Sequence, residues 1–422
     1  LKMKQLTRLF IPICLETLFY MLSGMVDTLM LSAVGDYAVG AVGTANSYIG
    51  IFIIMFSIIS SGMVSVMTQN IGAGRPGVAY QARQLGLLFN AVAGVLMAVF
   101  LFSGAGAILR MVGIADALYE PALIYLKIVG GGCILNAVIP IFSSYLRAFG
   151  YTKQPLYATI VGNIANFVMN AVFLFVLHKG VAGVATATVI SKILNLCIVL
   201  YFSHKLISAK NSTERIANKT VLGQIVKVGL PSACETALYN VAMMLVIRFL
   251  NQMDAEGLNV TARSYTATIS NFSYCVGAAL AQANAIMTGW HIGAGELEEC
   301  DRGTKRAAFV GVCVAVCMET AIVLGSGFIM PLFTDNPEMT ALVRKLLAID
   351  IVLEIGRVTN LVFGQALKTS GDAVFPAVIA AVFMFVFAVG GTWLFGISMG
   401  LMAVGAYIGL ASDECVLSLI HI

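Results

Sequence analysis

The sequence predicts an all-α membrane protein in which twelve transmembrane helices form two six-helix lobes, and three observations lead to this class. Hydrophobic residues make up 59% of the 422 residues and charged residues only 11%, which excludes an ordinary soluble protein. Apolar runs of about 20 to 30 residues, each long enough to cross a hydrocarbon core of about 30 Å, recur along the chain. Short motifs of the first half return in the second half in the same order.

The apolar runs number twelve, and Gly, Pro and Ser are scattered inside them. They lack the alternating ten-residue segments of an outer-membrane barrel, so we expect a helical bundle. The predicted spans are residues 7–33, 41–70, 84–112, 117–146, 154–178, 181–206, 222–250, 259–292, 303–332, 340–366, 373–397 and 401–422.

The placement of lysine and arginine predicts the orientation of the spans. Sixteen of the 25 lie on the side of the N-terminus and six on the opposite side. Because positive residues are retained in the cytoplasm, we expect a multi-pass protein of the cytoplasmic membrane with both termini cytoplasmic. The formal net charge of +4 therefore reflects topology and gives no reason to expect nucleic acid as a partner. The nine cysteines are dispersed without a CxxC pair, so we expect no metal centre, disulfide framework or cofactor.

An internal repeat relates the two halves at an offset of about 220 residues. The segment PICLETLFY from Pro12 pairs with PSACETALY from Pro231, and LRAFGYTKQP from Leu146 pairs with LKTSGDAVFP from Leu367. The motif IGAG also occurs once in each half. Since each copy holds an even number of spans, the two copies have the same orientation, which is the parallel repeat of some transporters.

The repeat also predicts the domains. We expect an N-terminal six-helix lobe at residues 1–207, a polar cytoplasmic linker at 208–221 and a C-terminal six-helix lobe at 222–422 with a truncated last helix. A cleft between two such lobes is the default place for a substrate.

Charged residues deep inside the spans are candidates for function, because each costs at least about 2.5 to 3.5 kcal/mol on insertion scales. On the first helix, Glu16 and Asp27 are eleven residues apart and share one face. The repeat reproduces Glu16 as Glu235, followed by Tyr239, whereas the position that matches Asp27 is Val246. Asp27 is therefore not a by-product of the duplicated scaffold.

Two further spans carry polar residues at helical spacing. Asn163, Asn166 and Asn170 share one face of the fifth span, where amides can coordinate a small cation, hold a carboxylate or simply join helices. In the tenth span Glu354 and Arg357 either neutralise each other or take part in function. Burial disfavours the charged form of a carboxylate, so such a group can exchange a proton or a sodium ion between the two membrane faces.

The chain resembles the multidrug and toxin extrusion (MATE) family along its whole length and in both halves. The segments that carry the resemblance are VDTLMLSAVGDYAVGAVG from Val26, QNIGAG from Gln69, LRAFGYTKQP from Leu146, GNIANFVMN from Gly162, GVAGVATATVIS from Gly180 and EIGRVTNLVFGQALKTSGDAVFP from Glu354.

The resemblance implies that two lobes rock between inward and outward states while proton or sodium entry drives export. It implies that Asp27 accepts the coupling ion together with Asn166, Asn170 and Thr188. Many members have Asp where this chain has Asn170. The missing charge weakens the inference of a sodium site at Asp27, Asn166 and Asn170 and favours a proton.

The resemblance also marks residues of the C-terminal lobe. Glu354, Arg357 and Asn360 look like an E-x-x-R-x-x-N pattern in the tenth helix of one branch, and Glu235 is similar to a seventh-helix acid of some members. Our second group of candidates, for substrate binding or for coupling in the C-terminal lobe, consists of Glu16 of the N-terminal lobe and Glu235, Tyr239, Glu354, Arg357 and Asn360 of the C-terminal lobe.

We predict a secondary active antiporter that exports amphipathic, mainly cationic organic compounds, as in multidrug efflux. Six acids against three bases deep in the first eleven spans favour a cationic guest. We expect small organic molecules and membrane lipids as partners, and a monomer.

Other functions stay open as alternatives. A lipid-linked saccharide flippase of a related fold would need a basic cleft, for which Lys127, Lys192 and Arg357 offer little. A channel remains an alternative that uncoupled, non-saturating flux would favour. An enzyme is not expected, because the sequence has no HExxH motif and no intramembrane stripe of histidines.

Overall fold

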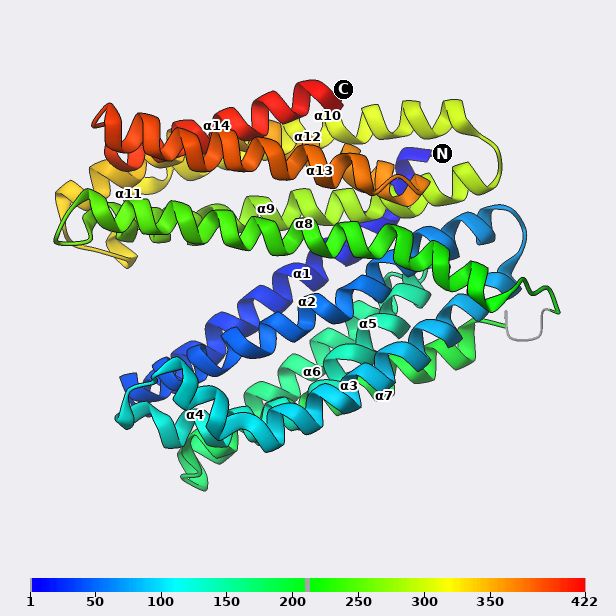
Figure 1. Cartoon of the computed structure of the whole chain (residues 1–422), viewed down its shortest axis with the longest axis horizontal. Coiled ribbons are helices and arrows are strands. Elements are labelled where there is room, and N and C mark those ends of the chain that lie inside the picture. Colours follow the sequence, from blue (N-terminus) through cyan, green and yellow to red (C-terminus); the bar gives the residue numbers. More distant parts are fainter. Residues whose placement is uncertain (1, 209–212, 422) are drawn as a thin grey trace. The chain divides into compact units, whose positions relative to one another are not determined.

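The protein is described by a computed structural model that covers residues 2–208 and 213–421 (Figure 1). Within these residues the chain is almost entirely helical and contains no β-strand. Helical segments follow all twelve predicted spans, because backbone polar groups inside a bilayer must be satisfied within their own segment.

The first six spans contain seven α-helices and a π-helical turn. They are α1 (Lys2–Ser32), α2 (Asp36–Gly72), α3 (Pro76–Val112), α4 (Asp116–Gly131), α5 (Cys133–Ala148), α6 (Lys153–Ala171), η1 (Val172–Val176) and α7 (Gly180–Leu206).

The last six spans contain seven α-helices and three short irregular helices. They are α8 (Asn218–Met253), α9 (Leu258–Gly293), α10 (Leu297–Leu324), α11 (Ser326–Ile329), η3 (Met330–Leu332), α12 (Pro337–Ser370), α13 (Val374–Phe383), η4 (Met384–Val389), η5 (Thr392–Ser398) and α14 (Met402–His421).

The span predicted at residues 117–146 is not one continuous helix. The structure divides it into α4 and α5, whose axes differ by 42° across Gly132. Gly130, Gly131 and Gly132 lie in a row at the bend, and each glycine costs about 1 kcal/mol relative to alanine in a helix. Hydropathy predicted the extent of this span but not its bend, because it does not register this loss of helix propensity.

Nine helices of the described chain, or ten spans if α4 and α5 are counted as one, are long and apolar enough to cross a membrane. The two remaining spans are α9, with 36 residues, and α12, with 34 residues. Both are as long as the other spanning helices but carry more polar side chains. The polar side chains of α12 include Asp350, Glu354 and Arg357, so its polarity coincides with candidate functional residues.

Several helices begin well before the spans predicted from hydropathy. α3 starts at Pro76 instead of residue 84, and α10 starts at Leu297 instead of residue 303. The additional turns carry polar residues such as Gln81 and Arg302. Hydropathy therefore marks the apolar section of each helix and misses the turns that extend beyond it.

The ends of α12 show how local sequence sets a helix boundary. The side-chain oxygen of Asn336 accepts hydrogen bonds from the backbone N–H groups of Glu338 (2.9 Å) and Met339 (3.5 Å), and Pro337 occupies the first turn. Gly371 ends the helix with a φ of 104°, a conformation that favours glycine.

The chain divides into two compact units, which we call the N-terminal unit (Ile11–Leu230) and the C-terminal unit (Leu1–Phe10 and Pro231–Ile422). These bounds differ from the predicted lobes at residues 1–207 and 222–422, because the division falls inside α1 and α8. Residues 209–212 of the predicted linker lie outside the described residues. Its end is part of the N-terminal unit, since Gln81 on α3 bonds to the backbone N–H and C=O of Ile216.

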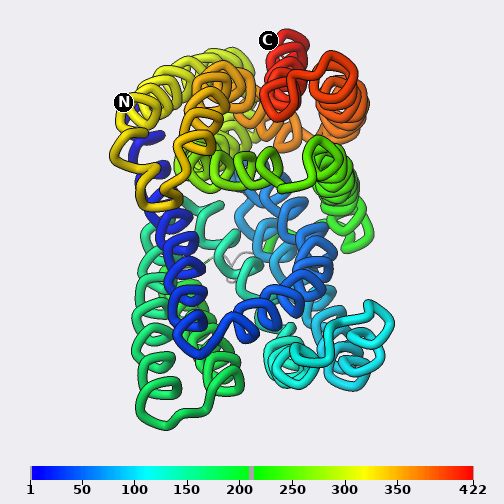
Figure 2. The backbone as a smooth tube through the Cα atoms, turned by 90° about the vertical axis from the view of Figure 1, so that its left-hand side faces the viewer, coloured from blue at the N-terminus to red at the C-terminus, as the bar shows by residue number. Residues whose placement is uncertain are grey.

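Each unit has its own apolar packing. In the N-terminal unit, α6 packs against α7, and α3 packs against α4 (Figure 2). In the C-terminal unit, α12 packs against α9, α10 and α14. Large apolar side chains such as Leu96, Val99 and Phe102 on α3 are more than half exposed, as expected for residues that face lipid.

Two glycines allow a close contact between α2 and α8 in the N-terminal unit. A Cβ atom added at Gly62 would overlap the carbonyl of Ile225, and one added at Gly229 would overlap the carbonyl of Ile58. Small residues of this kind let the backbones of membrane helices approach each other closely.

Candidate functional site

Asp27 on α1 is bound by two side chains of α6. The Nδ2 atom of Asn166 lies 3.1 Å from Oδ1 and 3.2 Å from Oδ2 of Asp27, and Nδ2 of Asn170 lies 2.8 Å from Oδ1. The two asparagines are four residues apart on α6, so both amides reach the same side of the helix. Asn166 is 6% exposed and Asn170 is fully buried. The structure thus brings together three of the four residues predicted for the coupling ion.

The Asp27 carboxylate has amide neighbours and no salt bridge. Among residues 2–208 and 213–421, no lysine or arginine forms an ion pair with it. The side-chain oxygens of Asn166 and Asn170 are buried and make no hydrogen bond. If the side-chain amide of each asparagine is flipped by about 180°, its oxygen faces Asp27. Two amide oxygens and the carboxylate can then bind a small hard cation together. With the amides as they stand, N–H groups stabilise the charged carboxylate.

Thr188, the fourth predicted residue, makes no hydrogen bond to Asp27 in the described structure. Its hydroxyl donates to the backbone carbonyl of Val184 at 2.9 Å. The Tyr125 hydroxyl interacts with Thr188, donates to Oδ1 of Asn46 at 3.2 Å and lies within electrostatic range of Asp27. No repeat and no stripe at helical spacing marks Tyr125 or Asn46 in the sequence, so sequence reasoning missed both.

Glu16, also on α1, is neutralised by a base. Its Oε2 atom lies 2.5 Å from Nη2 of Arg147 at the end of α5, and its Oε1 atom accepts a hydrogen bond from Thr159 on α6 at 3.3 Å. Glu16 therefore differs from Asp27 in having a fixed countercharge.

The C-terminal unit contains the repeat-related ion pair. Glu235 on α8 corresponds to Glu16, and its Oε2 atom lies 2.7 Å from Nζ of Lys368 near the end of α12. Lys368 corresponds to Arg147 in the repeated motif. The duplication has therefore preserved a pair that joins the first helix of each half to the end of another helix, which is a structural explanation for both acids.

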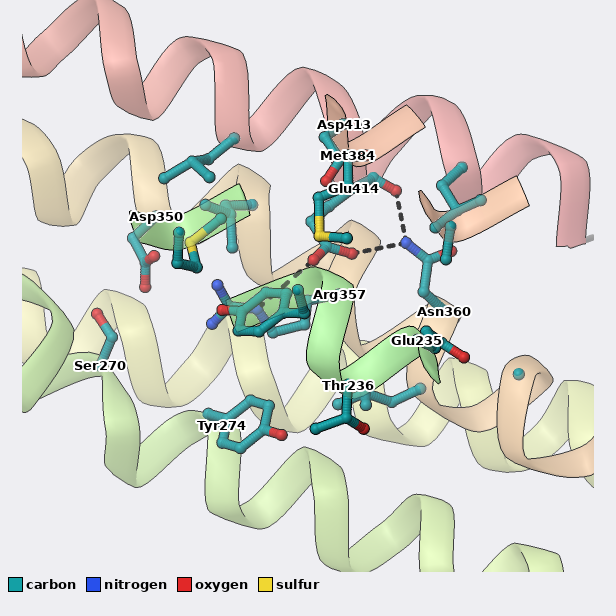
Figure 3. Close-up of a pocket in the computed structure, with 18 of the residues that line it drawn as sticks. Glu235, Thr236, Ser270, Tyr274, Asp350, Arg357, Asn360, Met384, Asp413 and Glu414 are labelled. Carbon is teal, nitrogen blue, oxygen red and sulfur yellow. Dashed lines mark hydrogen bonds and ion pairs between the residues drawn. The ribbon is translucent and has the colours of Figure 1, made fainter. Parts of the chain in front are cut away.

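A cavity of about 500 Å³ lies inside the C-terminal unit (Figure 3). Four of the six predicted candidates of the second group line it: Glu235, Tyr239, Arg357 and Asn360. Glu354 does not line it, and Glu16 belongs to the other unit. The acids among the lining residues are Glu235, Asp350, Asp413 and Glu414, and the bases are Arg263, Arg357, Lys368 and His421.

Arg357 is the main positive group of this cavity. Its Nη1 atom lies 2.5 Å from Oε1 of Glu354, and its Nε atom lies 3.9 Å from Oε1 of Glu414. Asn360, one turn further along α12, donates to Oε2 and to the backbone carbonyl of Glu414 at 2.7 and 2.8 Å (Figure 3). Sequence reasoning missed Glu414 because no motif or spacing in the last helix marked it.

The position of Glu414 depends on close packing of α12 against α14. A Cβ atom added at Gly356 would lie 2.6 Å from the backbone carbon of Glu414. Gly356 therefore lets α14 approach far enough for Glu414 to reach Asn360.

A helical membrane protein with two units of six spans, a buried carboxylate held by amides and an internal polar cavity has the build of a secondary transporter. A sequence model of the family described as MatE matches residues 12–172 and 231–408. The chain thus belongs to the MATE family of transporters.

The similar proteins cover almost the whole chain. "Uncharacterized transporter YisQ" of Bacillus subtilis (strain 168) is 32% identical over 411 residues, which are 96% of this chain and 90% of that protein. The outward-facing conformation of a multidrug resistance MATE family transporter of the MOP superfamily is 21% identical, with a TM-score of 0.87 and coverage of 99% and 93%. A MOP superfamily transporter from Pyrococcus furiosus, with a binding pocket described as having reverse polarity, is 20% identical, with a TM-score of 0.84 and coverage of 99% and 94%.

Proposed function

We propose that this MATE family protein is an antiporter that exports amphipathic organic cations across the cytoplasmic membrane in exchange for protons or sodium ions. The observation that carries the proposal is the Asp27 group, a carboxylate in an apolar helix that is held by two amides and has no ion-pairing base among the residues that the structure describes. Such a group binds a cation from one side of the membrane and releases it to the other when its surroundings change.

The coupling ion acts through charge neutralisation. When Asp27 is charged, the amide N–H groups of Asn166 and Asn170 stabilise it, as the structure has them. When a proton or sodium ion arrives, the charge is cancelled and these bonds weaken. Two arrangements of α1 relative to α6 therefore differ in their affinity for the ion. Such a difference in affinity is the minimum requirement for coupling.

A single carboxylate favours a proton over sodium as the coupling ion. Sodium usually has several oxygen ligands, and here only Asp27 supplies a full negative charge while Asn170 is neutral. A proton needs no further ligand.

The charges of the spans support a cationic substrate. Deep in the first eleven spans six acids stand against three bases, whereas the cavity of the C-terminal unit is lined by four acids and four basic residues. For the related transporter of Pyrococcus furiosus, the reverse polarity of the binding pocket is taken to suggest a different function. We take pocket polarity as the property that separates substrate classes on this fold.

The test is dye efflux from everted membrane vesicles, with the proton gradient and the sodium gradient collapsed separately. We expect energy-dependent transport of a cationic amphipathic dye to stop when one of the two gradients is removed. Asp27→Asn should abolish this transport at an unchanged amount of protein in the membrane, because it removes the group that binds the ion.

The matched control is Asp36→Asn, which removes an exposed acid at the start of α2. It should transport at the normal rate. Transport by Asp27→Asn at the rate of the unmodified protein would refute the role of Asp27. Flux that does not saturate and ignores both gradients would instead indicate a channel.

A further inference from the structure

Two helices of the N-terminal unit, α6 and α7, carry positive charge that no acid of either helix balances. α6 begins at Lys153, and Lys205 is the last residue but one of α7, so both lysines lie at the end of the bundle that is predicted to be cytoplasmic. Neither helix contains an aspartate or a glutamate. Both lysines are exposed, and neither forms an ion pair with residues 2–208 or 213–421. Two positive charges are therefore available to an external ligand.

Each of these lysines has a tyrosine one turn deeper in the same helix. Tyr157 follows Lys153 by four residues, and Tyr201 precedes Lys205 by four residues. Residues four apart lie on the same face of a helix, so each helix presents a lysine and a tyrosine together. Tyr157 is 47% exposed and Tyr201 is 57% exposed. Exposed tyrosines near the ends of spans are typical of the level of the lipid headgroups.

The ammonium group of Lys205 is held in position by Tyr201. Its Nζ atom donates a hydrogen bond to the Oη atom of Tyr201 at 3.2 Å and lies 5.4 Å from the centre of the tyrosine ring. This bond uses one of the three N–H donors of the ammonium group. The other donors of Lys205 remain able to bind a phosphate.

Below the two tyrosines, each helix exposes an apolar stripe. The stripes continue the spacing of three or four residues from Tyr157 and Tyr201, and their members are between 36% and 60% exposed. They are Val161, Ile164 and Val168 on α6, and Leu194 and Ile190 on α7. Apolar side chains that are exposed in the middle of a span face the lipid tails.

The two stripes lie side by side because α6 and α7 form an antiparallel hairpin (Figure 2). The helices meet at Gly162, where an added Cβ atom would lie 3.4 Å from the backbone oxygen of Ser191. On each helix, the exposed stripe is rotated away from this contact in the same sense along the chain. In antiparallel helices, equal senses of rotation place both stripes on one side of the pair.

We propose that this face of α6 and α7 binds an anionic phospholipid, with its phosphate at Lys153 and Lys205 and its acyl chains along the two apolar stripes. Basic residues between the cytoplasmic ends of membrane helices recognise anionic headgroups in this way. A lipid suits the face better than a free phosphate, because the stripes below the lysines offer contact to acyl chains. The site goes beyond the proposed coupling at Asp27 and shares no residue with the Asp27 group. Its occupant would contact α6, the helix that carries Asn166 and Asn170.

The experiment measures lipid binding to the purified full-length protein by native mass spectrometry from detergent micelles. The protein is titrated with phosphatidylglycerol and, separately, with phosphatidylcholine, whose headgroup has no net charge. We expect one phosphatidylglycerol per chain to be retained at concentrations where phosphatidylcholine is lost. This preference should decrease as salt is added, because salt screens the exposed lysines.

Substitutions locate the site. The double variant with Lys153→Gln and Lys205→Gln should bind phosphatidylglycerol at least about tenfold more weakly, because it loses both positive charges. The double variant with Lys153→Arg and Lys205→Arg keeps both charges and should bind normally. The matched control is Lys179→Gln, which removes an exposed lysine from the opposite end of the same hairpin and should also bind normally. Thermal unfolding confirms that each variant is folded.

Equal affinity of the double glutamine variant and the unmodified protein for phosphatidylglycerol would overturn the proposal. Equal retention of phosphatidylcholine would do the same, and so would an equal loss of binding in Lys179→Gln. Displacement of the lipid by an excess of inorganic phosphate would assign the lysines to a free anion instead. The assay uses neither substrate nor gradient, so its failure leaves the transport proposal standing, and a failed efflux assay leaves the lipid site standing.

Discussion

At Asp27, two asparagines determine how a carboxylate stays charged inside an apolar helix bundle. Their N–H groups face Asp27, while their oxygens have no hydrogen-bond partner. Glu16, on the same helix, is instead compensated by Arg147. The two acids of α1 therefore differ in their neighbours, and only Asp27 is free of a permanent countercharge among the residues described.

Asn170→Asp should convert the Asp27 group into a stronger sodium site. A second carboxylate at the position of the 2.8 Å contact raises the negative charge that attracts a cation. We expect ²²Na⁺ to bind the purified variant at least tenfold more tightly than the parent protein.

Asn163→Asp is the control for this change. Its amide donates to the backbone carbonyl of Phe19 at 3.0 Å and makes no bond to Asp27. It should leave sodium binding unchanged. Equal sodium affinity in the Asn170→Asp variant and the parent would contradict the assignment of Asn170 to this site.

Asp254 stabilises the start of α9 in a pH-dependent way. The backbone N–H of Asn259, at 3.0 Å, and that of Leu258, at 2.8 Å, donate to its carboxylate. The bond from Asn259 is the main reason that the pKa of Asp254 lies below its usual value of 3.8. The charged form is thus favoured in the folded state, and its contribution to stability is lost as pH falls through the folded-state pKa.

Asp254→Ala should lower stability by about 1 kcal/mol at neutral pH, as loss of a helix cap does. Because the unmodified protein loses this contribution in acid, the difference in Tm between the two proteins should shrink below about pH 4. Thermal unfolding in detergent at several pH values measures it. A difference in Tm that is constant between pH 7 and pH 3 would show that the charge of Asp254 is irrelevant.

At the scale of elements, glycines decide which helices can touch. Gly62 on α2 and Gly229 on α8 permit a backbone contact that no larger residue allows. Gly356 on α12 does the same for α14 and thereby brings Glu414 to the cavity. The hydrophobic effect contributes little to the association of helices inside a membrane, because lipid tails are as apolar as the side chains. Close packing of this kind stabilises the helix contacts instead.

Gly229→Ala should destabilise the protein, although alanine favours helices. The added methyl group would overlap the carbonyl of Ile58 and push α8 away from α2. We expect a Tm lower by at least about 2–4 °C, the shift that 1 kcal/mol produces in a unit of this size. Gly223→Ala on the same helix meets no atom within 4 Å and should leave Tm unchanged or raise it. Equal effects of the two substitutions would exclude the proposed contact.

At the scale of the whole molecule, the parallel repeat predicts equivalent loops on the same side of the membrane. Thr152 and Asp372 follow the repeated LR/LK motif and are predicted to be cytoplasmic, whereas Lys179 and Gly400 are predicted to be on the opposite side. Reporter fusions at these four positions test both the orientation and the repeat.

Fusions after Thr152 and Asp372 should give fluorescent GFP and inactive alkaline phosphatase. Fusions after Lys179 and Gly400 should give the reverse pattern, because phosphatase folds only outside the cytoplasm. Opposite results for Thr152 and Asp372 would mean an inverted repeat, and the predicted topology would have to be abandoned.

Hydropathy and charge were sufficient to predict the class of fold, because the bilayer imposes its thickness on every span. They predicted most span ends to within a few residues. They did not predict the bend at Gly132 or the polar first turns of α3 and α10. Repetition of Pro12, Glu16 and Tyr20 in the second half indicated the two six-span halves. It did not give the division within α1 and α8, which depends on contacts.

The sequence by itself determined that this is a duplicated helical membrane protein with Asp27 as an unrepeated charge, because composition, spacing and register are properties of the chain. Only the tertiary structure decided which polar groups meet. Glu319 with Asp350, Tyr125 with Asn46, and Glu414 with Asn360 are each brought together by helix packing. The physical reason is that a partner on another helix leaves no periodic signal in the sequence, whereas a partner on the same helix lies three or four residues away.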